Sequence, residues 1–463
     1  MKILIPVFAF FQLTTAHSSL VAVMDSGTDI SHKDLAPKSW VNLKERAGST
    51  IDLDQDGLPG DINGWDFTAN SPMVFDSRFV YLLTDDVKKF FDIYGKYDQG
   101  ILGPNSAEFS WLKEHSKDAV LMNKVNFIGA YIHGTHVAGI SLKDNPKAKV
   151  LSMKVIPTMY QELKSTPPTQ TKGSSPQTNE PPTKTFDQFR AQIIDDSTSQ
   201  VEEMIKLHNY VNFHRVDVVN QSFGIGWGDA QNFIKTAFVS DLKREPTDVE
   251  MKVLLKTYFG NLLKEGPRMF AAAPNSLFVI AAGNDHSDND IFPDYPADIQ
   301  AENKIVVAAT LGFRKLADFS NFGATKVDIA APGVSILSTA PANNYIPLSG
   351  TSQATPYVTS VIAMMKDINP NLSVREIKAL LFGTVDVKSW LKGKVKTSGI
   401  INKQRALKAA EFAKSLSIDK AIASAQQAVA DTPTMKSFNY NNIKLDIDFK
   451  PIRPSLLVKK MAE

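Results

Sequence analysis

Three side chains with acid, base and nucleophile chemistry stand far apart in this chain: Asp25, His133 and Ser352. A serine hydroxyl is a poor nucleophile at neutral pH and needs a base within hydrogen-bond reach. Histidine suits that role because its ordinary pKa lies near neutrality. A carboxylate then fixes the tautomer of the histidine and stabilises the imidazolium that forms. The three residue types therefore predict nucleophilic catalysis by Ser352, with His133 as the base and Asp25 as the group that orients it.

The neighbouring sequence predicts the elements that must position these residues. Residues 20–24 form a short apolar run that ends at Asp25, which predicts a buried parallel strand with a carboxylate at its carboxyl end. Residues 354–367 are apolar at helical spacing, so Ser352 is expected at a helix start, where backbone N–H groups can hold an oxyanion. Pro356 is expected in the first turn, where its missing N–H leaves no bond unmade. Taken alone, Ser352 fits an ordinary N-cap equally well.

The three segments around these residues resemble a known family. The chain order is acid, base, nucleophile, which is the order of subtilisin. The segments VAVMDSG (21–27), HGTHVAG (133–139) and GTSQATP (350–356) resemble the three signatures of the subtilase family of serine proteases. The resemblance implies an α/β fold with three layers, a mostly parallel central sheet and helical insertions. It also implies a serine endopeptidase that forms an acyl-enzyme. The resemblance covers residues 19–67, 127–156, 216–226 and 276–410.

The resemblance further assigns an oxyanion donor and a pocket for P1, the substrate residue on the amino side of the scissile bond. Residues 278–284 resemble the family's Ala-Ala-Gly-Asn segment, which makes Asn284 the side-chain donor of the oxyanion hole. The alternative for Asn284 is a turn residue with positive φ. Asp294 stands where many members have glycine, and it would favour Lys or Arg at P1; a solvated loop aspartate is the alternative. The pocket residues are Ser222, Phe223, Gly224, Ala281, Ala282, Gly283 and Asp294.

His133 and His136 also have the spacing of a metal-binding pair. A zincin motif needs a glutamate directly after the first histidine, and this chain has Gly134 there. The absence of that glutamate therefore disfavours zinc. The resemblance makes His136 a structural residue on the same helix as the base.

An acidic segment has the spacing of the first half of a calcium loop, in which alternate carboxylates precede a glycine turn. Its candidate ligands are Asp52, Asp54, Asp56 and Asp61. The twelfth position is Asn63 rather than glutamate, which disfavours an EF-hand. A looser structural calcium site and a solvated acidic turn both stay open, and the chemistry itself requires no cofactor.

Composition narrows the partners and the location. The 463 residues carry 51 basic and 49 acidic side chains, and no basic stripe argues for nucleic acid. The expected partner is a protein or peptide substrate, and nothing in the sequence predicts an oligomeric state. Residues 1–16 read as a secretory signal with an apolar run too short to span a membrane. The chain is therefore expected to be secreted or periplasmic, without a membrane span after signal cleavage. It has no cysteine, which neither supports nor opposes export.

The expected organisation is a signal peptide over residues 1–16, a peptidase domain over 17–412 and a C-terminal extension over 413–463. Insertions in the peptidase domain are expected at about 70–126, 157–200 and 229–268. The first catalytic strand begins near Ser19, so no pro-domain is expected between the signal and that strand.

Two other function classes stay open. One is a catalytically silent homologue that binds peptides, and the other is an interaction protein whose insertions carry the function. The intact catalytic positions favour the enzyme over both. A non-protease acyl hydrolase is disfavoured because Ser352 is not surrounded by a Gly-x-Ser-x-Gly elbow.

Overall fold

Short apolar runs form one central sheet in this computed structural model, which describes residues 17–161, 181–434, 449, 451 and 454. The strand order is β11-β12-β8-β6-β5-β4-β1-β3-β2, and β7 pairs with β6. The pairings are parallel except for β6 with β7 and β11 with β12. The strands are β1 (Leu20–Asp25), β2 (Gly64–Asp66), β3 (Lys149–Lys154), β4 (Val218–Gln221), β5 (Leu277–Ala281), β6 (Lys304–Leu311), β7 (Lys315–Leu316), β8 (Ile329–Pro332), β11 (Asp386–Val387) and β12 (Gly399–Ile400).

Helices cover both faces of this sheet, which is why its strands are apolar on both sides. Ala22 and Met24 of β1 belong to one core cluster, and Val21 and Val23 belong to the other. The first cluster lies under α4 (Phe186–Phe213), α5 (Trp227–Leu242), α6 (Asp248–Glu265) and α7 (Pro267–Ala271). The second lies under α3 (Ala119–Ser141), α8 (Thr351–Ile368), α9 (Val374–Gly383), α10 (Lys403–Phe412) and α11 (Ile418–Ala428). The predicted three-layer α/β fold is confirmed.

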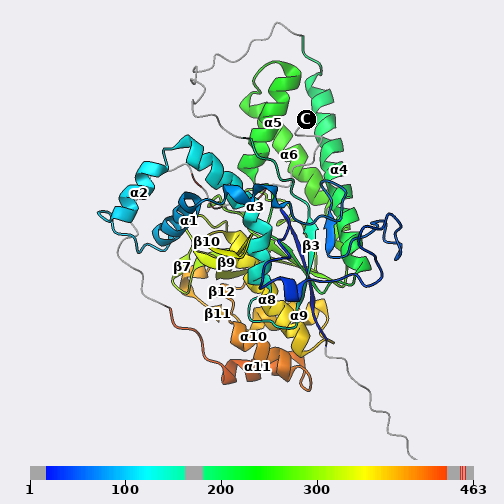
Figure 1. The fold of residues 1–463 in the computed structure, drawn as a ribbon, viewed down its shortest axis with the longest axis vertical. Coiled ribbons are helices and arrows are strands. Elements are labelled where there is room, and N and C mark those ends of the chain that lie inside the picture. The colour runs from blue at the N-terminus through cyan, green and yellow to red at the C-terminus, as the bar shows by residue number, and fades with distance from the viewer. Residues whose placement is uncertain (1–16, 162–180, 435–448, 450, 452–453, 455–463) are drawn as a thin grey trace, which may run out of the picture.

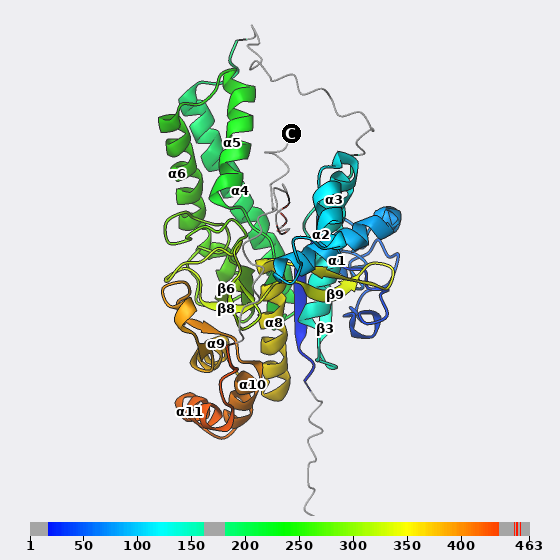
Figure 2. The same cartoon turned by 90° about the vertical axis from the view of Figure 1, so that its left-hand side faces the viewer.

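A third apolar cluster lies beside the sheet. It joins α1 (Asp85–Asp98), α2 (Ala107–His115) and the first half of α3 to the antiparallel hairpin of β9 (Ile336–Ala340) and β10 (Asn344–Leu348). Figures 1 and 2 show α1 and α2 on the opposite side of the molecule from α4, α5 and α6.

His136 ties α3 to the hairpin. Its Nε2–H donates to the carbonyl oxygens of Ile336 at 3.0 Å and Ile346 at 2.9 Å. The ring is fully buried, and burial lowers the pKa of His136 to about 3. A neutral histidine therefore fixes the helix that carries His133, as expected for a structural residue.

Some expectations concern residues beyond the described part of the chain. The signal peptide at 1–16 and most of the polar segment 165–184 lie outside the described residues and stay predictions. The domain boundaries also stay predictions, although α11 packs against α9 and α10. Among the described helices, none combines the length and the apolar character that crossing a membrane requires.

Two buried neutral histidines predict a loss of stability in acid. Burial lowers the pKa of His136 to about 3 and that of His208 on α4 to about 4, whereas an unfolded histidine titrates near about 6.5. The folded state therefore binds fewer protons, so this stability is present above about pH 6.5 and is lost as the pH falls towards the folded values. For His208 the full loss is about 3 kcal/mol.

The check is the melting temperature from neutral pH down to about pH 4, where the His208 contribution is mostly lost. His208→Gln should start from a lower value, because it loses the bond to the Met269 carbonyl. Its melting temperature should then fall less steeply with acid than that of the parent chain. Equal slopes in the two proteins would contradict the assignment.

Candidate active site

Asp25 and His133 form a buried pair at the carboxyl end of β1. The His133 Nδ1–H donates to Asp25 Oδ1 at 2.8 Å, and Oδ2 lies at 2.9 Å. The Ser26 N–H also donates to Asp25 Oδ1, at 2.7 Å. Both side chains of the pair are 0% exposed. With the Nδ1 proton directed at the carboxylate, the imidazole carries its lone pair on Nε2, which has no hydrogen-bond partner among the described residues.

The pair forms because α3 and the end of β1 approach each other very closely. A Cβ on Gly134 would lie 2.3 Å from the carbonyl oxygen of Gly27 and 3.1 Å from the Cβ of Asp25. No side chain fits at that distance, so the His-Gly sequence lets the helix backbone bring His133 onto Asp25. The Gly134 N–H also donates to Ser26 Oγ at 3.1 Å, which fixes the contact.

Ser352 is the second residue of α8 and is fully buried. Its Oγ–H donates to the Ser222 carbonyl oxygen at 3.0 Å, and the Ser222 Oγ–H donates to the Ser352 carbonyl oxygen at 3.0 Å. The predicted helix start is confirmed. No hydrogen bond joins Ser352 to His133 in the described structure. The hydroxyl is instead bonded to the segment that follows β4.

The expectation for Pro356 is wrong in its position. Pro356 is the sixth residue of α8, beyond the first turn. An N–H at this position would donate to the carbonyl of Ser352, four residues earlier. Because proline lacks that N–H, the Ser352 carbonyl is free to accept from Ser222 Oγ. The proline thereby allows the contact between α8 and the segment after β4.

Asn284 lies beside the start of α8, three residues after the end of β5. Its Oδ1 accepts from the Thr351 N–H at 2.9 Å and from Thr351 Oγ1 at 2.8 Å, which orients the amide. Its Nδ2 donates to the carbonyl oxygen of Pro451 at 3.1 Å. Gly283 has the positive φ of 117°, and Asn284 is not among the residues with positive φ. The alternative of a positive-φ turn residue is therefore wrong for Asn284.

The predicted pocket segments leave two neighbouring strands. Ser222 to Gly224 follow β4, and Ala281 is the last residue of β5, which pairs with β4 in parallel and is followed by Ala282 and Gly283. The side chain of Phe223 belongs to the core below α4 to α6, so the backbone of this residue is the part that can border a pocket. The Gly224 N–H donates to the carbonyl oxygen of Pro454 at 3.1 Å.

Asp294 is 1% exposed, which excludes the solvated loop. Backbone hydrogen bonds between Ile225 and Tyr295 hold its segment against the end of the predicted pocket strand. A Cβ on Gly226 would lie 3.6 Å from Asp294 Oδ2, 3.0 Å from Asp285 Oδ2 and 3.9 Å from Asp229 Oδ2. Three carboxylates therefore surround one glycine beside the predicted pocket.

A fourth carboxyl group lies close by, because the Asp294 N–H donates to Asp298 Oδ2 at 2.9 Å. Burial, followed by the charge of Asp294, raises the pKa of Asp298 to about 7. Sequence reasoning missed Asp229 and Asp285, because nothing in their spacing indicates that they approach Asp294. The position of Asp285 directly after the oxyanion candidate was the available signal.

The acidic segment is divided between two groups of ligand atoms. Glu45, Asp52 and Asp54 offer carboxylate oxygens that all lie within 4.8 Å of one another, and so do the ligand atoms of Asp54, Asp56 and His214. The Asp52 carboxylate also accepts from the backbone N–H groups of residues 55 and 57, while Asp54 Oδ1 has no hydrogen-bond partner among the described residues. The predicted set of four aspartates therefore does not meet at one point.

Asp61, the fourth predicted ligand, belongs to neither group of ligand atoms. It accepts from Tyr210 at 2.5 Å and from Asn42 at 2.7 Å, and His214 Nε2 lies 3.5 Å away. Burial disfavours a charge on His214, but hydrogen bonds to Asp56 and Asp61 outweigh it and raise its pKa to about 9. His214 thus acts as a cation that compensates these two aspartates, and Glu45 completes the carboxylate group with Asp52 and Asp54.

The comparisons with known proteins agree on one family. A family model described as "Subtilase family" matches residues 16–410. Alkaline elastase YaB of Bacillus sp. (strain YaB) is 41% identical over 114 residues, which are 25% of this chain and 29% of that protein. Thermitase of Thermoactinomyces vulgaris is 38% identical over 131 residues, which are 27% of this chain and 44% of that protein. These matches span less than half of either relative.

Among solved structures, a cold adapted subtilisin-like serine proteinase aligns with 16% identity and a TM-score of 0.41. That alignment covers 83% of this chain and 86% of the other.

Proposed function

Because this chain belongs to the subtilase family, we propose that it is a serine endopeptidase that hydrolyses peptide bonds through an acyl-enzyme. The observation that carries the proposal is the buried pair of Asp25 and His133, whose Nε2 has no partner in the described structure. A neutral imidazole held in this tautomer has the lone pair that a general base needs.

In the proposed reaction, the Ser352 hydroxyl gives up its hydrogen bond to the Ser222 carbonyl oxygen. Its Oγ then attacks the carbonyl carbon of the substrate. His133 Nε2 takes the hydroxyl proton and then gives it to the leaving amine, while Asp25 stabilises the imidazolium. Asn284 Nδ2 and the backbone N–H of Ser352 stabilise the oxyanion. Water then hydrolyses the acyl-enzyme, with His133 acting again as base and acid.

A second candidate is a catalytically silent peptide-binding homologue. The observation that favours it is the hydroxyl of Ser352, which donates to the Ser222 carbonyl instead of to His133. Catalytic hydrogen bonds are often long or unformed without substrate, so this contact alone does not outweigh the buried pair.

We expect Ser352→Ala to abolish both labelling by a fluorophosphonate and hydrolysis of casein. Asn284→Ala should still be labelled, but its kcat should fall by about 10²–10³-fold, the loss known for the corresponding donor of subtilisin. Circular dichroism of each variant controls for folding. A folded parent chain that neither labels nor hydrolyses would favour the silent homologue.

We further propose a preference for Lys or Arg at P1, supported by the carboxylates of Asp294, Asp285 and Asp229 around Gly226. A buried carboxylate favours a cationic side chain because the charge-assisted hydrogen bond forms away from water.

Asp294→Ser should lower kcat/KM for substrates with Lys or Arg at P1 by about 10–100-fold, since a hydrogen bond between charged groups contributes about 1.5–3 kcal/mol. Hydrolysis after an apolar P1 residue should change little. Asp85→Ser, whose side chain is fully exposed on α1, is the matched control. Equal losses for basic and apolar substrates would refute a charge-based preference.

We propose a structural calcium ion at Glu45, Asp52 and Asp54. Carboxylate oxygens are the ligands that calcium prefers, and Asp54 Oδ1 lacks another partner in the described residues. The ion would hold the acidic loop together and would supply no catalytic chemistry.

Millimolar calcium should raise the melting temperature by at least about 2 °C if it binds the folded chain alone. Glu45→Gln should lose this shift. Glu203→Gln, an exposed glutamate on α4, should keep it. A shift that survives Glu45→Gln would place the ion elsewhere.

We also propose that the enzyme acts outside the cytoplasm. The apolar run near the N-terminus supports export, and its removal by a signal peptidase would leave the catalytic strand close to the new end.

A further inference from the structure

The C-terminal tail touches the candidate active site at both predicted substrate contacts. The carbonyl oxygen of Pro451 accepts from Asn284 Nδ2, the proposed oxyanion donor, at 3.1 Å. The carbonyl oxygen of Pro454 accepts from the N–H of Gly224, on the predicted pocket strand, at 3.1 Å. These are the positions at which a substrate backbone would be held.

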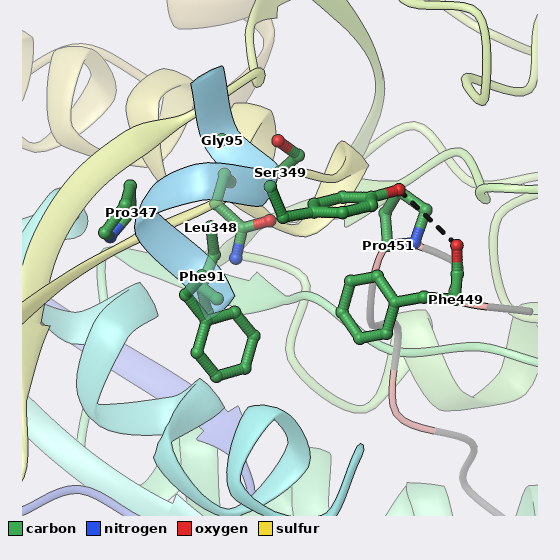
Figure 3. A pocket seen from close by; sticks show the side chains of 9 residues that line it. Phe91, Gly95, Pro347, Leu348, Ser349, Phe449 and Pro451 are labelled. Atoms are coloured by element: carbon green, nitrogen blue, oxygen red, sulfur yellow. Dashed lines mark hydrogen bonds between the residues drawn. The ribbon is translucent and has the colours of Figure 1, made fainter. Parts of the chain in front are cut away.

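The side chain of Phe449 packs into the aromatic cluster of α1, close to the oxyanion donor Asn284. Its ring lies 4.7 Å from Tyr94 and 5.2 Å from Phe90, both in edge-to-face contact, and it is 8% exposed. The Tyr94 hydroxyl donates to the Phe449 carbonyl oxygen at 3.4 Å. Figure 3 shows Phe449 and Pro451 together, with Phe91 of α1 close by. A small pocket remains next to the ring, and its lining consists of Phe449 and Pro451 together with Phe91, Tyr94, Gly95, Pro347, Leu348, Ser349 and Gln353.

Gln353 adds a polar group to this pocket. It directly follows Ser352 and is 1% exposed, yet neither its Nε2 nor its Oε1 has a hydrogen-bond partner among the described residues. Its Oε1 and the Nδ2 of Asn284 both lie near Gly350, at 2.7 Å and 3.3 Å from a Cβ built there. A buried amide without partners is unfavourable unless a ligand completes its bonds. The pocket therefore combines aromatic walls with an amide suited to a peptide.

The direction of the tail differs from that expected of a substrate. The segment from Ser222 to Gly224 borders the predicted P1 pocket, so a substrate should place residues on the amino side of the scissile carbonyl along it. In the tail, Pro451 contacts the oxyanion donor and Pro454, on its carboxyl side, contacts Gly224. From Pro451 to Pro454 the tail therefore runs in the direction opposite to that expected of a substrate. The Pro451 carbonyl group is thus not in the orientation that leads to cleavage.

We propose that α1 and β10 form a subsite for an aromatic side chain of a peptide, and that Phe449 occupies it in cis and makes the tail an internal inhibitor. The proposal rests on the proposed peptidase function, whose active site the tail covers. A tethered segment competes at a high effective concentration, so a substrate must displace it before the reaction starts. The fraction of molecules with a free site then scales the apparent affinity for substrate.

The first test compares the parent chain, Phe449→Ala and Tyr81→Ala, each with the tail intact, on a fluorogenic peptide substrate. Phe449→Ala should raise kcat/KM at least about tenfold, mainly by lowering KM, because the free fraction of sites increases. Tyr81→Ala removes an aromatic side chain that is 70% exposed and should leave kcat/KM unchanged. Equal kcat/KM in all three proteins would overturn the proposal.

The second test does not depend on catalysis. A fluorescent peptide of residues 446–456 (DIDFKPIRPSL) is titrated into the Ser352→Ala, Phe449→Ala double variant. It should bind, and the same peptide with alanine in place of Phe449 should bind at least about tenfold more weakly, a difference of about 1.4 kcal/mol. Equal binding of the two peptides would overturn the subsite. Binding of the first peptide, with no hydrolysis by any variant that retains Ser352, would keep the subsite and reject the peptidase function.

Cleavage of the tail separates an inhibitor from a substrate. Mass spectrometry of the active chain after prolonged incubation should find residues 446–456 intact. A cut within this segment that disappears in Ser352→Ala would show that the tail binds as a substrate, which would overturn the inhibitory role.

Discussion

The close approach of α3 to the end of β1 is the constraint on which the rest of the site depends. At Gly134 the helix passes the Gly27 backbone with no room for a side chain, and His133 reaches Asp25 in a fully buried space. Burial of a carboxylate is tolerated only when its oxygens are hydrogen-bonded, and the imidazole and the Ser26 N–H meet that need. The same arrangement directs the histidine lone pair away from the carboxylate, where a proton transfer can use it.

A second set of contacts joins α8 to the ends of β4 and β5. Ser222 and Ser352 exchange hydrogen bonds, and Pro356 makes this exchange feasible by leaving a helix carbonyl without its usual donor. Asn284 holds the Thr351 N–H at the same helix start. Ser352 and Asn284, the proposed nucleophile and oxyanion donor, are therefore positioned by one local network, which couples α8 to the ends of two adjacent parallel strands.

Helix α1 and the hairpin of β9 and β10 add a further set of contacts beside the central sheet. Aromatic side chains of α1 line a small pocket together with Pro347 and Leu348 of β10, and His136 fixes the hairpin to α3. The Pro451 carbonyl oxygen accepts from Asn284 Nδ2, so Phe449 and Pro451 lie against a site that is built from residues much earlier in the chain.

The sequence by itself determined the features that depend on local order. The apolar runs predicted the strand that ends at Asp25 and the helix that starts near Ser352, because a burial pattern is a local property. The resemblance of the three signatures to the subtilase family implied the fold class. Only the tertiary structure decided which distant groups meet. The ion pairs of His214 with Asp56 and Asp61, the approach of Asp285 and Asp294 to Gly226 and the tail on Asn284 all join residues separated by long stretches of chain. No periodicity encodes such contacts, since they arise from the packing of whole elements.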